Sequence, residues 1–174
     1  MSNPKNIFVV GTGRCGTMTC SRACRHASNY TSAHESPMRL DLAYPDNHIE
    51  VSPRLTWVLP LLVERYPTAL YVHLRRRKED VVASWMRRGR HRGPGHWAPL
   101  VWHNRPGDFR RTCSLCYDAM TGSIDTTLAA AGVERMTLDL ETIRQTWRAF
   151  WQRIAAEGDF QKSLAEWNLR YNAS

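Results

Sequence analysis

Three glycines, an arginine and a threonine form a short cluster directly after an apolar segment. The segment is Ile7-Phe-Val-Val10, and the cluster is Gly11-Thr-Gly-Arg-Cys-Gly-Thr-Met18. Glycines let the backbone turn sharply and approach an anion closely, and the N–H groups that begin a following helix point at that anion. The sequence therefore predicts an anion-binding loop, in which the charge of Arg14 adds to the backbone dipoles.

This loop lacks two groups that nucleoside triphosphatases use. Those enzymes end the loop with Gly-Lys-Ser or Gly-Lys-Thr, whose lysine reaches the β- and γ-phosphates and whose hydroxyl binds Mg²⁺. Here the loop ends Gly16-Thr17-Met18. We therefore expect an anion to be bound without a metal ion. An ordinary strand-to-helix turn is the alternative that the loop alone leaves open.

A second cluster of polar residues follows another apolar segment. Leu70-Tyr-Val-His-Leu74 is followed by three arginines, and Ser84 comes about two turns into a predicted helix. Ligands of open α/β sheets bind at the carboxyl ends of the strands. Because a guanidinium and a hydroxyl suit one phosphate group, we expect Arg76 and Ser84 to meet the same ligand. A solvated group of arginines is the alternative.

Together the two clusters resemble the sulfotransferases that use 3′-phosphoadenosine 5′-phosphosulfate (PAPS) as sulfuryl donor. In that family a loop of the type Pro-Lys/Arg-Ser-Gly-Thr-Thr holds the 5′-phosphosulfate, and a later Arg-x7-Ser element holds the 3′-phosphate. Gly13-Arg-Cys-Gly-Thr-Met18 matches the first, and Arg76 to Ser84 keeps the offset of the second. The resemblance covers roughly residues 5–90. It implies a P-loop-like α/β fold, 3′-phosphoadenosine 5′-phosphate (PAP) as product and no metal ion.

The resemblance also implies which residues bind the donor, and where this chain departs from the family. The implied binding residues are Gly13, Arg14, Cys15, Gly16, Thr17, Met18, Arg76 and Ser84. Gly13, Cys15 and Met18 replace the usual Pro, Ser and Thr, so backbone contacts are retained while two hydroxyl contacts are lost. Arg77-Lys78 replaces the usual Asn-Pro or Asp-Pro. The adenine contacts stay unassigned.

Sulfuryl transfer needs a base that takes the proton of the acceptor. Tyrosylprotein sulfotransferases and related bacterial groups carry a catalytic glutamate about 19 residues beyond the Gly-Thr step, and Glu35 lies 19 residues beyond Gly16. The resemblance therefore implies Glu35 as general base, with His34 as second candidate and Arg14 stabilising the leaving group. Glu50 and His48 are further options. A helix-capping or surface carboxylate is the alternative for Glu35.

The rest of the chain predicts the elements that position these residues. Apolar runs predict strands at residues 7–11, 48–51, 70–74 and 135–140, and helices are predicted at 17–27, 53–66, 78–90, 109–131 and 141–157. Strands that alternate with helices favour a single α/β domain over residues 1–174, a three-layer P-loop-like fold with a central, mainly parallel sheet. Residues 89–108 are rich in turn formers and predict a lid or acceptor loop.

Composition narrows the class of protein. The 174 residues contain no apolar run near the roughly 20 residues that span a bilayer, and the N-terminus lacks the apolar core of a signal peptide. Five cysteines without framework spacing predict reduced thiols in the cytoplasm. Cys113 and Cys116 could bind zinc with His91, His96 and His103, but two partly buried thiols on one helix are the favoured interpretation.

Two other functions stay open at this point. A degenerate P-loop kinase or nucleotide-binding protein would need the missing lysine and an aspartate at a strand end. A nucleic-acid-binding protein would use the net charge of +8, which comes from 21 Arg and 3 Lys against 16 acidic residues, along one extended face. We expect neither nucleic acid nor a membrane as partner. The acceptor could be a small molecule, a saccharide or a peptide.

Overall fold

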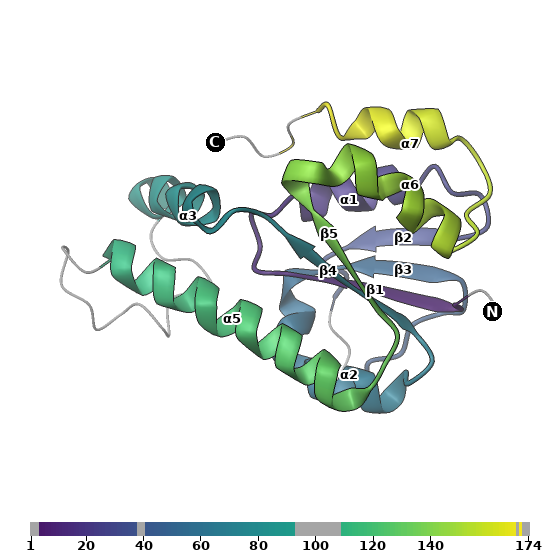
Figure 1. Ribbon diagram of the computed structural model, residues 1–174, viewed down its shortest axis with the longest axis horizontal. Helices are drawn as coiled ribbons and strands as arrows, with labels where there is room; N and C mark the ends of the chain where they lie inside the picture. Colours follow the sequence, from purple (N-terminus) through teal and green to yellow (C-terminus); the bar gives the residue numbers. More distant parts are fainter. Residues whose placement is uncertain (1–3, 38–40, 93–108, 170, 172–174) are drawn as a thin grey trace.

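The computed structural model describes residues 4–37, 41–92, 109–169 and 171 (Figure 1). Strands, α-helices and 3₁₀ helices (η) follow in the order β1 Asn6–Val10, α1 Thr17–Cys24, β2 Thr31–His34, β3 His48–Val51, η1 Pro53–Val58, α2 Leu59–Arg65, β4 Leu70–Arg75, α3 Lys78–Arg92, α5 Phe109–Ala131, β5 Arg135–Asp139, η4 Leu140–Thr142, α6 Ile143–Arg153 and α7 Phe160–Glu166.

The five strands form one sheet in the order β2-β3-β1-β4-β5, and every neighbouring pair is parallel. β1 lies at the centre, where Phe8 is in register with Glu50 of β3 and Tyr71 of β4. All five residues of β1 are buried, which explains why four of them, Ile7–Val10, form a continuous apolar run. Because the strands are parallel, their carboxyl ends share one edge of the sheet, called here the carboxyl edge.

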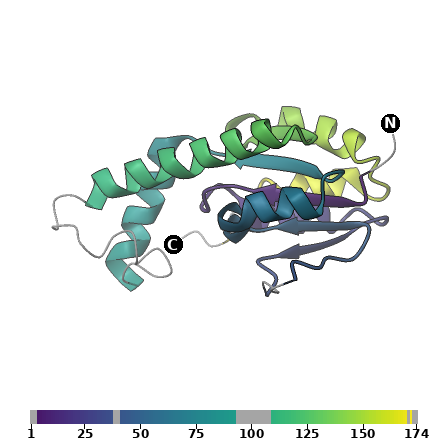
Figure 2. The ribbon, with the colours of Figure 1, turned by 90° about the horizontal axis from the view of Figure 1, so that it is seen from below.

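Helices cover both faces of the sheet (Figures 1 and 2). On one face α1, α6 and α7 pack on Ile7 and Val9, with Trp147 buried between them. On the other face η1, α2 and α5 pack on Phe8 and Tyr71. The predicted three-layer α/β fold is therefore confirmed, and its sheet is parallel throughout.

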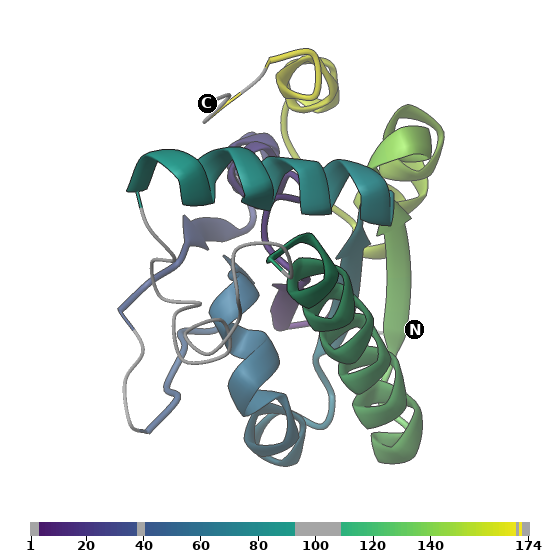
Figure 3. The same ribbon diagram turned by 90° about the vertical axis from the view of Figure 1, so that its left-hand side faces the viewer.

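α3 lies outside these two layers. Its apolar side packs on the first half of α5 in a separate cluster, formed by Val81, Val82, Trp85, Cys113, Tyr117 and Met120. Figure 2 shows α3 and α5 extending beyond the sheet, and Figure 3, which looks onto this end of the molecule, shows α3 running across it. Since α3 follows β4 almost directly, the helix that carries Ser84 lies at the carboxyl edge.

Apart from shifted ends, such as those of the predicted helices 17–27 and 141–157, the observed elements differ from the predicted ones as follows. The predicted helix 53–66 begins as the 3₁₀ helix η1 and becomes α-helical only at Leu59. β2 is not predicted because this edge strand, Thr-Ser-Ala-His, has no large apolar residue. α7 is not predicted either, since its fully buried side chain is a serine. Residues 89–92 belong to α3 rather than to the predicted lid, and 93–108 lie outside the described residues.

The structure shows the state of the cysteines and the character of the described helices. All five cysteines are unpaired; Cys113 is buried and Cys116 half-buried on α5. Within the described ranges, no three His, Cys, Asp or Glu side chains are grouped as metal ligands, and His96 and His103 lie outside those ranges. None of the described helices combines the length and the apolar character needed to cross a membrane.

Candidate functional site

The loop between β1 and α1 turns through left-handed backbone. The φ angles of Gly13, Arg14 and Gly16 are 73°, 57° and 94°. Gly16 is the N-cap of α1 and has no side chain with which to cap it. The first N–H groups of α1 thus have no capping side chain, and such groups bind anions.

Gly11 allows this loop to lie directly against the end of β4. A Cβ atom at Gly11 would come within 2.6 Å of the Leu74 carbonyl oxygen and 2.9 Å of the Cys15 Sγ atom. Cys15 is fully buried between the sheet and α1, and burial raises the pKa of its thiol to about 12. The predicted binding residue Cys15 can therefore offer only its backbone to a ligand, and its thiol stays protonated.

Arg14 joins the two sequence clusters. Its Nε atom donates a hydrogen bond to Ser84 Oγ at 2.9 Å, and its carbonyl oxygen accepts one from Arg76 Nη1 at 3.1 Å. Tyr117 of α5 donates to the Arg76 carbonyl at 2.8 Å and so supports the segment between β4 and α3. Residues that are more than 60 positions apart in the chain thus meet at the carboxyl edge, and the two sequence clusters lie side by side.

Four guanidinium groups gather at this point. The pKa of Arg14 is lowered, first by burial and then by the charges of Arg88, Arg76 and Arg87. Arg87 and Arg88 are exposed and lie three and four residues beyond Ser84, on the same side of α3. The two sequence clusters do not include these two residues, although their helical spacing from Ser84 is a usable signal. Like charges repel, so this arrangement is suited to an anion that neutralises them.

The end of β2 lies against the start of α1. His34 Nε2 is 3.1 Å from Thr17 Oγ1, and the pKa of His34 is lowered, mainly by burial, so its imidazole is neutral at pH 7. Glu35 follows at the carboxyl edge with its side chain 32% exposed, and its Oε2 is 3.7 Å from Arg54 Nη2. His34 thus contacts the Gly11–Met18 loop through Thr17, and Glu35 is the residue that follows His34. Met18, the last residue of the loop, is half-buried.

Glu50 has very different surroundings from Glu35. Its residue is only 1% exposed, and its carboxylate accepts hydrogen bonds from the Ser36 N–H at 3.0 Å, Ser36 Oγ at 2.7 Å and His48 Nε2 at 3.2 Å. Burial raises the pKa of Glu50, but the bonds from His48 and Ser36 outweigh burial and lower it overall. The geometry makes Glu50 a hydrogen-bonded group inside the protein, not one that meets an acceptor.

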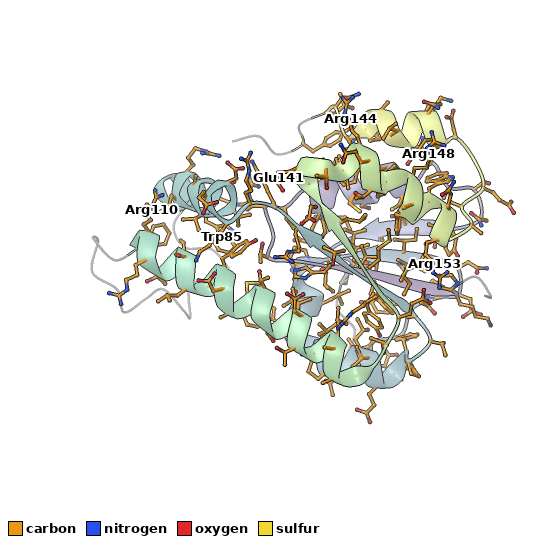
Figure 4. The ribbon with its side chains drawn as sticks, in the orientation of Figure 1. Trp85, Arg110, Glu141, Arg144, Arg148 and Arg153 are labelled. Carbon is orange, nitrogen blue, oxygen red and sulfur yellow. The ribbon has the colours of Figure 1, made fainter. Side chains whose placement is uncertain are left out.

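The C-terminal part of the chain flanks the start of α1. A Cβ atom at Gly16 would lie 3.2 Å from Leu140 Cδ1 and 3.5 Å from Trp167 Cζ3. Trp167 in turn packs edge-on against Trp147, with ring centroids 5.1 Å apart. Glu141 of η4, labelled in Figure 4, accepts a hydrogen bond from the Arg77 N–H at 3.0 Å. Residues far along the chain therefore enclose the loop, and no local signal in the sequence indicates this.

Neither a comparison with models of protein families nor one with curated proteins finds a match to this chain.

Proposed function

We propose that this chain is a PAPS-dependent sulfotransferase, which transfers the sulfuryl group of PAPS to a hydroxyl or amine of an acceptor. The observation that carries the proposal is the contact of Arg14 with both Ser84 and Arg76. These residues come from the two separate clusters that resemble the donor-binding elements of the family. Their meeting supports one ligand that carries two anionic groups, as PAPS does.

The residues at the carboxyl edge fit such a donor chemically. The backbone of residues 13–18 and the start of α1 would hold the phosphosulfate, and Arg76 with Ser84 would hold the 3′-phosphate. Arg14, Arg76, Arg87 and Arg88 supply positive charge to both groups. A sulfuryl group carries less charge than a phosphoryl group, so fixed N–H dipoles and arginines can serve where kinases use Mg²⁺.

Glu35 would act as the general base, with His34 as the second candidate. The acceptor oxygen or nitrogen forms a bond to sulfur, the bond from sulfur to the 5′-phosphate oxygen breaks, and the acceptor proton passes to the base. Arg14 would stabilise the negative charge that forms on PAP as it leaves. The position of Glu35 supports this role. Its carboxylate is partly exposed at the carboxyl edge, and the preceding residue, His34, contacts Thr17.

The two alternative functions have less support. A kinase would need an aspartate at the end of a strand beside β1, but β3 is followed by Ser52 and β4 by Arg76. A nucleic-acid-binding protein would align its arginines on one face. Figure 4 shows Arg144, Arg148 and Arg153 along α6 and Arg110 at the other end of the molecule, and two of the arginines of α6 have partners within the protein, since Arg153 is paired with Glu134 and Arg148 stacks on Phe160.

The proposal also covers the cellular location of the protein and the acceptor of the sulfuryl group. Five unpaired cysteines favour a reducing compartment, and we place the protein in the cytoplasm on this ground. The acceptor is tested with one phenol, one saccharide and one tyrosine-containing peptide, by measuring PAP released from PAPS in the presence of each.

Thermal unfolding with added nucleotide tests the proposal directly. At about 100 times its Kd, a ligand of the folded state adds about 2.7 kcal/mol, which corresponds to roughly 5–10 °C for a chain of this size. We expect PAP to produce such a shift and ATP with Mg²⁺ to produce a much smaller one. Arg76→Ala should weaken the response to PAP, while Arg148→Ala, on the outer side of α6, should respond as the wild type does. A preference for ATP with Mg²⁺, or no response to PAP, would overturn the proposal.

A further inference from the structure

Glu35 lies in a backbone conformation that only surrounding contacts can maintain. Its φ angle is 51°, in the left-handed region that residues with a Cβ atom rarely adopt. Such a conformation costs free energy and persists only where neighbouring groups hold it, which occurs most often at functional sites. The groups that hold Glu35 are therefore of interest.

Strand β3 holds Glu35 from both sides. The Glu35 N–H donates to the Val51 carbonyl oxygen at 3.2 Å, which extends the β2–β3 ladder by one residue. The next residue, Ser36, donates its N–H to Glu50 Oε1 at 3.0 Å and its hydroxyl to Glu50 Oε2 at 2.7 Å. The left-handed turn thus lies between the backbone hydrogen bond to Val51 and the two hydrogen bonds from Ser36 to the Glu50 carboxylate.

Glu50 is itself held in place. His48, two residues earlier on the same face of β3, donates from Nε2 to Glu50 Oε2 at 3.2 Å, and its Nδ1 lies 2.8 Å from Thr31 Oγ1. An imidazole with its proton on Nε2 satisfies both contacts, since the Thr31 hydroxyl then donates to Nδ1. The Tyr44 ring stacks on His48 at 5.9 Å. A hydrogen-bonded chain therefore runs from the first residue of β2 to the residue after Glu35.

A buried carboxylate is a costly way to join two strands, because an apolar pair would avoid the loss of hydration. A carboxylate offers something that an apolar side chain does not, namely two oxygens that fix the direction of one peptide group. We propose that Glu50 is a positioning residue, which holds the Glu35 carboxylate toward the acceptor by fixing the turn at Ser36. This inference rests on the proposed function, in which Glu35 is the base.

Amide hydrogen exchange tests the hydrogen bonds between Ser36 and Glu50 and needs no substrate. Glu50→Gln keeps the shape of the side chain but removes the charge that strengthens both bonds to Ser36. We expect the Ser36 amide to exchange about 10-fold faster in this variant, a change of about 1.4 kcal/mol, while amides of β1 and β4 keep their wild-type rates. Glu64→Gln, an exposed change on α2, should leave the Ser36 amide unchanged. An unchanged Ser36 amide in Glu50→Gln would overturn the proposal.

A double-mutant cycle separates positioning of the base from a general effect on the fold. Turnover is measured as PAP release from PAPS for the wild type, Glu35→Gln, Glu50→Gln and the double variant. If Glu50 acts through Glu35, its substitution lowers turnover about 10-fold in the wild type but less than about twofold when Glu35 is already replaced. An equal loss in both backgrounds would contradict positioning.

Binding of PAP distinguishes failure of this inference from failure of the proposed function. The thermal shift with PAP should be the same in Glu50→Gln as in the wild type, because the Glu50 side chain bonds to Ser36 and His48 rather than to the Gly11–Met18 loop. If PAP fails to stabilise the wild type, the proposed function fails. The exchange of the Ser36 amide then still decides whether Glu50 fixes the turn that carries Glu35.

Discussion

At the scale of single residues, Arg14 connects more of the site than any other described residue. Its backbone turns the loop with a φ angle of 57°, its carbonyl oxygen accepts from Arg76, and its guanidinium donates to Ser84. The same guanidinium is partly buried and lies in the positive field of Arg88, Arg76 and Arg87, which favours the approach of an anion. In the proposed function, such a preformed charge would stabilise the leaving group without reorganising during the reaction.

We expect Arg14→Ala to lower the release of PAP from PAPS by about 10²-fold, as the loss of a preorganised charge does. The measurement is turnover at saturating PAPS, with circular dichroism to verify the fold. Arg148→Ala serves as the matched control because it removes an equal charge from the outer side of α6, and it should keep wild-type turnover. Near-normal turnover of Arg14→Ala would contradict the role given to this residue.

Cys15 occupies a position at which the sulfotransferases that the sequence resembles have a serine. The resemblance implies that one hydroxyl contact is lost here. In this chain the Cys15 side chain fills the space above Gly11, under the loop. The Cys15 side chain therefore packs beneath the loop, and only its backbone N–H group is offered to a ligand.

At the scale of elements, the layer formed by α1, α6 and α7 is joined by one buried serine. Ser163 of α7 donates to the Ala23 carbonyl of α1 at 2.8 Å and accepts from Trp147 Nε1 of α6 at 2.9 Å. Neither Ser163 nor Trp147 has measurable exposure. This contact places α7 over α1, the helix whose first residues belong to the anion-binding loop.

Ser163→Ala should destabilise the protein by about 1–3 kcal/mol, because the buried Trp147 Nε1–H then loses its acceptor. Urea unfolding followed by circular dichroism measures the change in the free energy of unfolding. Ser123→Ala is the control, since Ser123 is exposed on α5 and its replacement should change the free energy by less than about 0.5 kcal/mol. Equal stability of the two variants would show that the contact between α6 and α7 is not needed.

At the scale of the whole molecule, the buried His73 and the half-buried His34 make the free energy of unfolding depend on pH. His73 of β4 is 2% exposed and bonds to Asp125 of α5 at 2.9 Å; its pKa is lowered by burial, although Asp125 opposes the shift. The pKa of His34 is lowered by burial as well. The unfolded chain, whose histidines have a pKa of about 6.5, therefore binds protons at a higher pH than the folded chain does.

We expect the free energy of unfolding to decrease as the pH falls from 7 to 5. Each histidine with a lowered pKa destabilises the folded state once the pH passes below about 6.5, and His73 alone contributes at most about 1.4 kcal/mol per pH unit. Urea unfolding at several pH values measures this slope. His73→Gln should be less stable than the wild type at pH 7 but should lose less stability on acidification. A slope equal to that of the wild type would show that His73 does not contribute.

The sequence predicts the elements that have a strong local pattern. β1 and β4 are apolar runs buried on both faces, and the predicted helix 109–131 coincides with α5. β2 and α7 are not predicted because neither has a local apolar pattern. β2 is a partly exposed edge strand, and the buried side chain of α7 is that of Ser163. At the site, Arg14, Arg76 and Ser84 are predicted to share a ligand, whereas Arg54 and Ser36 show no motif.

The sequence by itself determined the parallel α/β class, and it predicts an anion-binding loop at Gly11–Met18. Both depend on local properties, namely the period of apolar residues and the spacing of glycines before a helix. Only the tertiary structure decided that Arg14 contacts Ser84 and that Glu50 is buried while Glu35 is partly exposed at the carboxyl edge. These facts depend on contacts between residues far apart in the chain, and such contacts exist only once the strands are ordered in the sheet.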